Sequence, residues 1–253
     1  MIAVNEYFSV VDEGEGWILL NKGAPLIVHP ANDRGDEATL LGGVQSLLAY
    51  ELANGAALSI MNRLDRETSG LVMMATRKSV ARELGRAMER RLVSKSYDAV
   101  VFGWPEWDTL RVDEPMLRKG EVEESRIYVK QMVHPEGKQC VTNLEVLRRY
   151  VVKGVKVAHL RVKPTTGRMH QIRVHAAFVG HPLVGDKIYG EDEDVYLRFI
   201  VEGEYEGMLD AVKLPRHALH ASGLKLELAG EWQEFEIGLA DDIAAFLAGA
   251  EAG

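Results

Sequence analysis

The stretch Asn62-Arg-Leu-Asp-Arg-Glu-Thr-Ser-Gly-Leu-Val-Met-Met-Ala75 decides how the fold of this chain is interpreted. Its last five residues are apolar at every position, which is typical of a β-strand that is buried on both faces. The three residues before them, Thr68–Gly70, are types that favour a sharp turn. The sequence therefore predicts a central buried strand over 71–75, with a charged segment at its mouth.

Helical periodicity indicates three helices around this strand. Apolar residues recur at intervals of three and four over Thr39–Leu52, Arg77–Leu92 and His170–Val179. In the second range, basic residues follow the apolar stripe two positions out of phase, which places them on the opposite helix face. That basic stripe consists of Lys78, Arg82, Arg86 and Arg90.

Further strands are expected where the chain has short apolar runs or strict alternation. They are Trp17–Asn21, Leu26–Val28, Tyr97–Phe102, Val141–Leu147 and Val155–Lys163. The first two are expected to pair as a hairpin, and the last carries His159, Arg161 and Lys163 on one face. Strands outnumber helices without a regular β-α alternation, so the sequence predicts an α+β fold with a mixed, mostly antiparallel sheet flanked by helices.

Length and composition are those of an ordinary globular protein. The chain has 253 residues, of which 47% are hydrophobic and 27% charged, and no Pro/Ser-rich linker divides it. We therefore expect one domain over residues 1–253. A single cysteine, Cys140, and a polar, acidic N-terminal stretch predict a cytoplasmic protein without a signal peptide. No apolar run approaches the roughly 20 residues that cross a membrane.

The charge is unevenly distributed. The formal net charge is −8, which by itself argues against a nucleic-acid partner. However, Arg63–Lys95 contains nine basic and four acidic residues, and Arg148–Lys187 contains nine basic residues and only one acidic residue, Asp186. This asymmetry predicts a basic face on an acidic body, whereas the alternative is scattered, solvated charge.

The charged segment before the central strand is the first candidate site. Asp65 lies between Arg63 and Arg66, and a carboxylate at the mouth of a buried strand is well placed for catalysis. The alternative is a salt-bridge cluster on the surface beside a turn.

The segment Thr165–His175 is the second candidate site. Arg168, His170, Gln171 and Arg173 gather at the expected start of a helix. Hydrogen-bond donors at a helix N-terminus suit a phosphate or a carboxylate partner. The alternative is a capped helix with a solvated basic end.

Metal and nucleotide cofactors are not indicated. His170 and His175 are five residues apart, which separates them by about 140° on a helix instead of placing them on one face. The chain has one cysteine and no His-x-x-x-His pair, and it also lacks the glycine-rich phosphate loops of nucleotide-binding proteins. We therefore expect no metal site and no cofactor.

A set of motifs in a fixed order resembles the RluA-type RNA pseudouridine synthases. The motifs are Arg63–Leu71, Lys95-Ser-Tyr97, Thr166–His175 and Gly180–Asp186, joined by Asn21-Lys22, Val28–Pro30 and Ala218–Ala221. Each motif alone is a weak signal, but the ordered set is specific, and it covers roughly residues 17 to 235.

This resemblance implies a bifurcated sheet with a central active-site cleft, and isomerisation of specific uridines in structured ribosomal or transfer RNA to pseudouridine. It implies that Asp65 is the catalytic residue and that Arg168 pairs with its carboxylate. Tyr97 would pack against the flipped target base and could take the final proton. RNA is the expected partner of a monomeric protein, and we expect its substrate contacts from Arg63, Arg66, Thr68, Lys78, Arg82, Arg86, His170, Gln171 and Arg173.

The chain departs from the family pattern in three places. Asn62 stands where relatives commonly have His, and Asn21-Lys-Gly-Ala-Pro25 changes the usual order Asn-Lys-Pro-x-Gly. Only about 16 residues precede the first motif, so we expect no separate N-terminal RNA-binding domain.

Two other functions are compatible with these residues: a catalytically idle RNA-binding protein of the same fold, and an acid/base hydrolase that uses Asp65 with His170. A hydrolase would yield a cleaved product instead of an isomer of unchanged mass.

Overall fold

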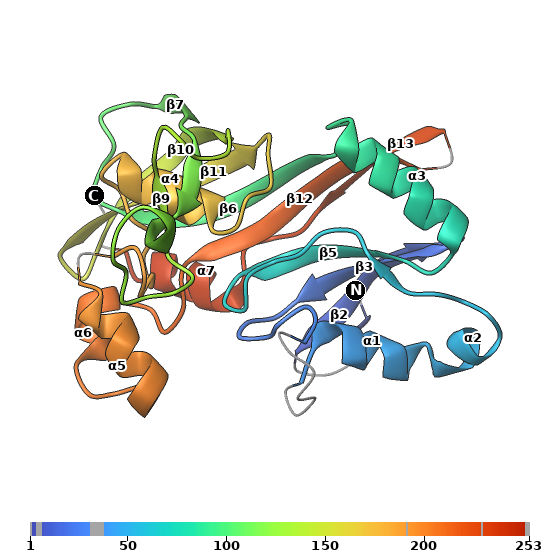
Figure 1. Cartoon of the computed structure of the whole chain (residues 1–253). Coiled ribbons are helices and arrows are strands. Elements are labelled where there is room, and N and C mark those ends of the chain that lie inside the picture. Colours follow the sequence, from blue (N-terminus) through green and yellow to red (C-terminus); the bar gives the residue numbers. More distant parts are fainter. Residues whose placement is uncertain (1, 4–6, 31–37, 191, 229, 251–253) are drawn as a thin grey trace. The chain divides into compact units, whose positions relative to one another are not determined.

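The computed structural model describes residues 2–3, 7–30, 38–190, 192–228 and 230–250. The chain divides into two compact units (Figure 1). Unit 1 comprises Met1–Ser94 and Ala221–Gly238, and unit 2 comprises Lys95–His220 and Leu239–Gly253. The organisation as one catalytic domain stays a prediction.

Unit 1 is built on a sheet of mostly antiparallel strand pairs. Its elements are β1 (Ile2–Ala3), β2 (Phe8–Gly14), β3 (Trp17–Lys22), α1 (Leu40–Leu47), α2 (Ala49–Ala53), β4 (Ser59–Ile60), β5 (Ser69–Ala75), α3 (Lys78–Glu89), the later part of β12 (Leu219–Leu228) and β13 (Glu231–Glu236). The strand order is β1-β2-β3-β5-β12, with β4 paired to β5 and β13 paired to β12.

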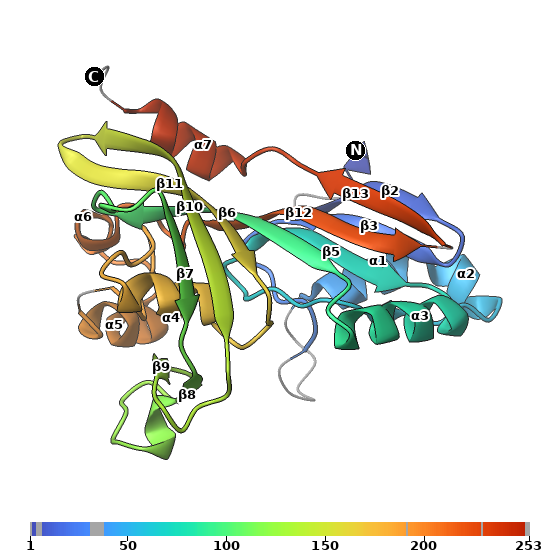
Figure 2. The same cartoon turned by 90° about the horizontal axis from the view of Figure 1, so that it is seen from above.

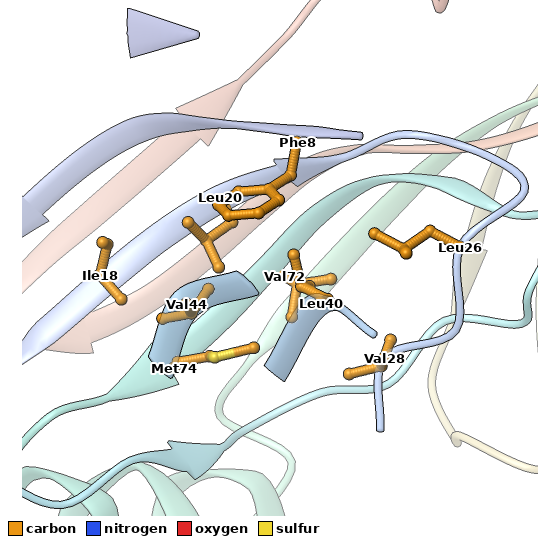
Figure 3. Close-up of a cluster of buried hydrophobic side chains, with 9 residues drawn as sticks. All are labelled: Phe8, Ile18, Leu20, Leu26, Val28, Leu40, Val44, Val72 and Met74. Atoms are coloured by element: carbon orange, nitrogen blue, oxygen red, sulfur yellow. The ribbon is translucent and has the colours of Figure 1, made fainter. Parts of the chain in front are cut away.

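Strand β5 is the centre of this unit, and all of its residues are buried. Val72 and Met74 pack against α1 in the apolar cluster that Figure 3 shows. The alternate residues, Met73 among them, pack on the other face against Leu84 of α3. The prediction of a strand buried on both faces is therefore confirmed. Burial of each large apolar side chain contributes about 1.5–3 kcal/mol before the entropy of folding is subtracted.

The prediction that Leu26–Val28 forms a strand paired with Trp17–Asn21 is wrong. Strand β3 instead pairs with β2 and β5, and residues 23–28 form a loop with one bridge between Ile27 and Thr39. The main chain of Leu26 is engaged elsewhere, because its N–H donates to the Arg66 carbonyl. Its own carbonyl accepts a hydrogen bond from the Lys22 ammonium.

The expected single helix over Thr39–Leu52 is also wrong, because two helices, α1 and α2, occupy this range and meet at Leu48. Thr39 does cap the first helix, accepting a hydrogen bond from the Gly42 N–H at 2.9 Å. No residue of α2 is buried, so packing does not hold it in line with α1. Helix α3 matches its prediction but ends at Glu89, which leaves Leu92 exposed beyond it.

Unit 2 contains a second antiparallel group of strands. Its elements are β6 (Ser94–Phe102), β7 (Thr109–Asp113), β8 (Met116–Arg118), the 3-10 helix η1 (Lys119–Glu121), β9 (Gln131–Val133), β10 (Val141–Val152), β11 (Val155–Pro164), α4 (Gln171–Phe178), α5 (Asp194–Glu202), α6 (Met208–Val212) and α7 (Asp241–Ala248). The strand order is β6-β11-β10-β7, while β8 and β9 form a small sheet of their own.

The two faces of the unit 2 sheet are covered differently. Helix α7 packs on one face, where Ile243 meets Val100 and Val157. Helix α4 lies on the other face, since the Gln171 amide donates to Thr142 of β10. Figure 2 shows α7 and α4 on opposite sides of these strands. The register places Tyr97 opposite Val162, and Val162 opposite Leu144, so Tyr97 lies on the α4 face.

The predicted fold class is confirmed. Helices flank mostly antiparallel strands, and the described residues add one parallel bridge between Ile27 and Thr39. The alternation predicted for Val155–Lys163 is also confirmed, because Leu160 is buried while Lys163 is exposed. The bifurcated course of the sheet and its central cleft stay predictions.

Candidate active site

Asp65 lies in a tight turn that leads into β5. The Thr68 N–H donates to the Asp65 carbonyl at 3.1 Å, and this hydrogen bond closes the turn. Asp65 is partly exposed and Arg66 is exposed, whereas Thr68 is buried. Asp65 is therefore partly accessible, while the end of the turn is anchored in the protein.

Lys22 holds this turn from one side. Its ammonium group is fully buried and donates hydrogen bonds to the carbonyls of Gly23 (2.8 Å), Leu26 (2.7 Å) and Arg66 (3.2 Å). A buried ammonium is strongly unfavourable unless it is hydrogen-bonded, so these carbonyls and Lys22 fix one another. Sequence reasoning placed Lys22 in a motif but gave it no role.

Asn62 holds the other side of the Asp65 turn. Its side-chain N–H donates to the Leu71 carbonyl at 3.0 Å, and its side-chain oxygen accepts from the Met73 N–H at 2.8 Å. One amide thus satisfies a donor and an acceptor of β5. Asn62, which stands where relatives commonly have His, therefore has a structural role in this chain.

Gly70 lets β5 approach the later part of β12 closely. Its φ is +112°, and a Cβ atom built on it would lie 2.3 Å from the Ala221 carbonyl oxygen. Any other residue would clash with that backbone and would also adopt an unfavourable φ. The motifs around Gly70 and Ala221 therefore meet within unit 1.

Two arginines flank Asp65 in the sequence and are both exposed. Arg63 contacts the half-buried His29, with 3.1 Å between the Arg63 guanidinium and His29 Nε2. The motif residues Val28–Pro30 are thereby joined to the segment around Asp65.

The basic stripe of α3 lies on the exposed face of that helix. Lys78, Arg82 and Arg86 are exposed, whereas Leu84 is fully buried. The predicted separation of the basic and apolar stripes is therefore confirmed. Whether RNA contacts the stripe stays a prediction.

Tyr97 is buried in unit 2, with 9% of its surface exposed. Lys95 lies two residues earlier on β6 and so projects toward the same face of the sheet. Burial lowers the pKa of the Lys95 ammonium. The Lys-x-Tyr motif therefore combines a largely buried phenol with a poorly solvated amine.

The Arg168 loop (Thr165–Arg168) is fastened to β10. The Thr165 N–H donates to the Val141 carbonyl at 3.0 Å, and the Thr166 hydroxyl accepts from the Val141 N–H at 3.2 Å. The Arg168 side chain itself is exposed and close enough to hydrogen-bond Cys140. Burial nevertheless raises the pKa of the Cys140 thiol, and Arg168 only partly opposes that rise.

Gln171 and Arg173 point inward instead of toward solvent. Gln171 is 4% exposed and its side-chain oxygen accepts from the Arg168 N–H at 3.0 Å. Arg173 is 5% exposed and binds Asp186 through two hydrogen bonds of 2.7 and 2.9 Å. Burial alone would raise the pKa of Asp186, but the charge and hydrogen bonds of Arg173 hold it well below its usual range. These two side chains therefore support the Arg168 loop and α4.

His170 has a left-handed backbone conformation, with φ of 57°, immediately before α4. Its Nδ1 lies 2.7 Å from the Tyr189 hydroxyl, which also accepts a hydrogen bond from the Gln131 N–H at 2.9 Å. The His170 ring is half-buried, so one edge is fastened while part of the ring remains accessible.

The predicted site residues thus fall into two groups. Unit 1 carries Arg63, Asp65, Arg66, Thr68 and the α3 stripe, and unit 2 carries Tyr97, Arg168, His170, Gln171 and Arg173. Within unit 2, Tyr97 and helix α4 share one face of the sheet. The pairing of Asp65 with Arg168 stays a prediction.

Two other kinds of feature are absent from the described part of the chain. The described residues contain no group of three or more His, Cys, Asp or Glu side chains that could hold a metal ion. Among the described helices, none is both long and apolar enough to cross a membrane.

Comparison with known proteins identifies the family. The sequence profile of the RNA pseudouridylate synthase family matches residues 16–178, which is more than half of the chain. The chain therefore belongs to the RNA pseudouridylate synthase family, and the resemblance inferred from the motifs is confirmed.

Named relatives are ribosomal large subunit pseudouridine synthases D. The protein of Escherichia coli (strain K12) is 34% identical over 220 residues, which cover 86% of this chain and 62% of that protein. The protein of Vibrio cholerae is 32% identical over 240 residues, covering 93% of this chain and 68% of that protein. This chain thus spans less than two thirds of the length of the Escherichia coli relative.

Solved structures show the same fold. Human RNA Pseudouridylate Synthase Domain Containing 1 superposes with a TM-score of 0.72 at 24% identity, covering 97% of this chain and 88% of that chain. Human RNA Pseudouridylate Synthase Domain Containing 4 gives a TM-score of 0.71 at 22% identity.

Proposed function

We propose that this protein converts specific uridines of ribosomal RNA to pseudouridine, with Asp65 as the catalytic residue. The observation that carries the proposal is the Asp65 turn, which Lys22 and Asn62 fasten from two sides while Asp65 remains partly exposed. Catalytic groups are commonly presented in this way, on a short segment held by a rigid scaffold. The choice of ribosomal RNA follows the names of the relatives, which are synthases of the ribosomal large subunit.

The chemistry needs only groups that the chain itself supplies. The bond from the ribose to the ring nitrogen breaks, the base turns, and a bond forms to carbon 5. The proton on carbon 5 is then removed, and the released ring nitrogen gains a proton. Atoms are neither added nor lost, so we propose that no cofactor takes part. A carboxylate can serve either as a nucleophile or as a base on the sugar, and Asp65 fills that role.

Tyr97 and Arg168 complete the proposed site. The uridine must leave its stack before its glycosidic bond can react, and Tyr97 provides an aromatic face against which the flipped base packs. Arg168 pairs with the Asp65 carboxylate and orients it. Arg63, Arg66, Thr68 and His170 contact the RNA in this proposal. We assign Gln171 and Arg173 a supporting role instead, because their side chains are buried and bonded within unit 2.

The proposal is tested with unmodified ribosomal RNA that has been transcribed in vitro. Incubation with the protein should yield pseudouridine at discrete positions, detected by chemical mapping, with the RNA chain intact and its mass unchanged. Cleaved product would support the hydrolase that uses Asp65 with His170. Binding without any pseudouridine would support the idle RNA-binding protein.

RNA binding by the α3 stripe gives a separate prediction. Replacing Arg82 and Arg86 together with Gln should weaken RNA binding at moderate salt with little effect on the melting temperature, because both side chains are exposed. If each arginine contacts a phosphate, the slope of log affinity against log salt should fall by about 0.7–0.9 per residue. Titrations at several salt concentrations measure this slope.

The matched control removes two other exposed arginines, Arg126 and Arg198, which form ion pairs with Asp194 and Glu202. That double variant has the same change in net charge and should keep the wild-type slope. Equal slopes for both double variants would contradict the α3 footprint. The basic side of β11 is a less suitable RNA-binding surface than the α3 stripe. Its His159 lies 2.6 Å from the Asp98 carboxylate, on the sheet face opposite to Tyr97.

A further inference from the structure

The Gln171 side chain uses its full hydrogen-bonding capacity inside unit 2. Its oxygen accepts from the Thr166 hydroxyl at 2.7 Å and from the Arg168 N–H at 3.0 Å. Its nitrogen donates to the Val141 carbonyl at 2.9 Å and to the Thr142 hydroxyl oxygen at 3.0 Å. A primary amide has two acceptor lone pairs and two N–H donors, so these contacts leave none for a substrate.

The orientation of this amide is fixed by its partners. The Arg168 main-chain N–H can only donate, and the Val141 carbonyl can only accept. Flipping the Gln171 amide would therefore set a donor against a donor and an acceptor against an acceptor in a buried place. The side chain acts as a spacer of set length and polarity between β10 and the main chain of Arg168.

The spacer has its own buried anchor. Thr142 Oγ1 lies 2.8 Å from His175 Nδ1, and His175 Nε2 lies 3.1 Å from the Glu114 carbonyl oxygen. Burial lowers the pKa of His175, so the ring is neutral at pH 7. A neutral ring must carry its proton on Nε2 to reach the Glu114 carbonyl, and its Nδ1 then accepts from the Thr142 hydroxyl. The hydrogen-bond chain thus runs without conflict from Glu114 to Arg168.

We propose that Gln171 is a positioning residue that holds the main chain of Arg168 in the conformation used for catalysis. The inference rests on the proposed function, in which Arg168 pairs with Asp65. The Arg168 side chain is long and exposed, and a misplacement of about 1 Å at a reacting centre can lower a rate by about a hundredfold. Other hydrogen bonds fasten Thr165 and Thr166 to β10. The Gln171 side chain differs from these because it binds the main-chain N–H of Arg168 itself.

The first test is Gln171→Leu, which keeps the approximate size and removes the amide. We expect kcat to fall by about 10–100-fold while the KM for RNA changes by no more than about threefold, because the contact acts on turnover and not on RNA affinity. Ile172→Val is the matched control, since Ile172 is a buried apolar residue of the same helix. Its melting temperature should fall while kcat per folded molecule stays unchanged.

A second variant, Gln171→Glu, gives a signature that a merely structural role lacks. The carboxylate still accepts from the Arg168 N–H but cannot donate to Val141, whereas the protonated acid regains one donor. Burial raises the pKa of a carboxyl group, so the protonated form extends toward neutral pH. The kcat of this variant relative to wild type should therefore be highest at low pH and fall as pH rises, while the relative kcat of Gln171→Leu stays flat.

A double-mutant cycle with Arg168→Met completes the test. If Gln171 acts through Arg168, Gln171→Leu should cost little further turnover once Arg168 is absent. Multiplying effects would overturn the proposal, and so would a raised KM at wild-type kcat. If Gln171→Leu does not fold, Thr142→Val takes its place, because it removes the hydroxyl that anchors the Gln171 amide. Thr142→Val should also lower kcat, but by a smaller factor than Gln171→Leu. Full activity of Arg168→Met would overturn the role of Arg168 itself, whereas normal kcat of Gln171→Leu beside an inactive Arg168→Met would overturn only the positioning role.

Discussion

Asp65→Asn is expected to abolish pseudouridine formation, with a loss in rate of about 10⁴-fold or more. The amide of Asn has nearly the same shape as the carboxylate but cannot attack the sugar or remove a proton from it. RNA affinity should remain within about threefold of wild type, because the shape of the turn and its hydrogen bonds through main-chain atoms are kept. Single-turnover assays on ribosomal RNA fragments, together with binding titrations, measure both quantities.

Glu67→Gln is the control, since Glu67 is a half-buried carboxylate in the same turn. It should retain most of the activity. Comparable losses in both variants would mean that the acidic turn as a whole matters, and substantial turnover by Asp65→Asn would falsify the assignment of Asp65. The assignment also requires that Asp65→Asn still binds RNA. If the variant no longer bound RNA, its inactivity would be explained by lost binding and not by the loss of the catalytic group.

Arg168→Met is expected to lower the single-turnover rate by about a hundredfold or more. The guanidinium provides the charge and the hydrogen bonds that orient the Asp65 carboxylate in the proposed site. The exposure of Arg168 predicts a melting temperature close to that of wild type. Arg168→Lys should recover part of the rate, since an ammonium keeps the charge but lacks the planar fork that binds a carboxylate through two hydrogen bonds.

Arg126→Met serves as the control for lost charge, because Arg126 is an exposed arginine of unit 2 that pairs with Asp194. Its activity should equal that of wild type. The pairing itself is tested by combining Arg168→Met with Asp65→Asn: two residues that work as a pair give a double variant little slower than the slower single variant. Rate losses that multiply would show that Arg168 and Asp65 act independently.

Periodicity predicted β5 and α3 well, but it merged α1 and α2 into one helix and failed for the short run Leu26–Val28. Strand β5 and helix α3 each repeat their apolar pattern over enough residues to define a face, and the structure confirms both. The three apolar residues Leu26–Val28 are too short a run for that. Their conformation depends on contacts with the buried Lys22 ammonium and with the distant Arg66 carbonyl, which the apolar pattern could not reveal.

The sequence predicted which polar residues belong to the candidate site, but it did not predict which of their side chains point into the protein and which face solvent. Arg168 and Arg173 are the same residue type in the same motif, yet the first is exposed and the second is buried against Asp186. That difference depends on an acidic partner 13 residues further along the chain. Spacing within α4 cannot identify such a partner, so the supporting roles of Gln171 and Arg173 emerged only from the structure.

The Lys22 ammonium group also bears on which sequence changes this protein can tolerate. Its hydrogen-bond acceptors at Gly23, Leu26 and Arg66 are all main-chain carbonyls, which every amino acid possesses. Substitutions in the loop after β3 can therefore alter side chains without removing those acceptors, provided that the course of the backbone is kept. This explains how Asn21-Lys-Gly-Ala-Pro25 can depart from the family order while still fastening the Asp65 turn. Sequence drift in this loop should be wide at Ala24 and Pro25 and narrow at Lys22 itself. It should also be narrow at Gly23, where a Cβ atom would lie 2.8 Å from the Tyr7 carbonyl oxygen, and at Leu26, which is buried in the apolar cluster of unit 1.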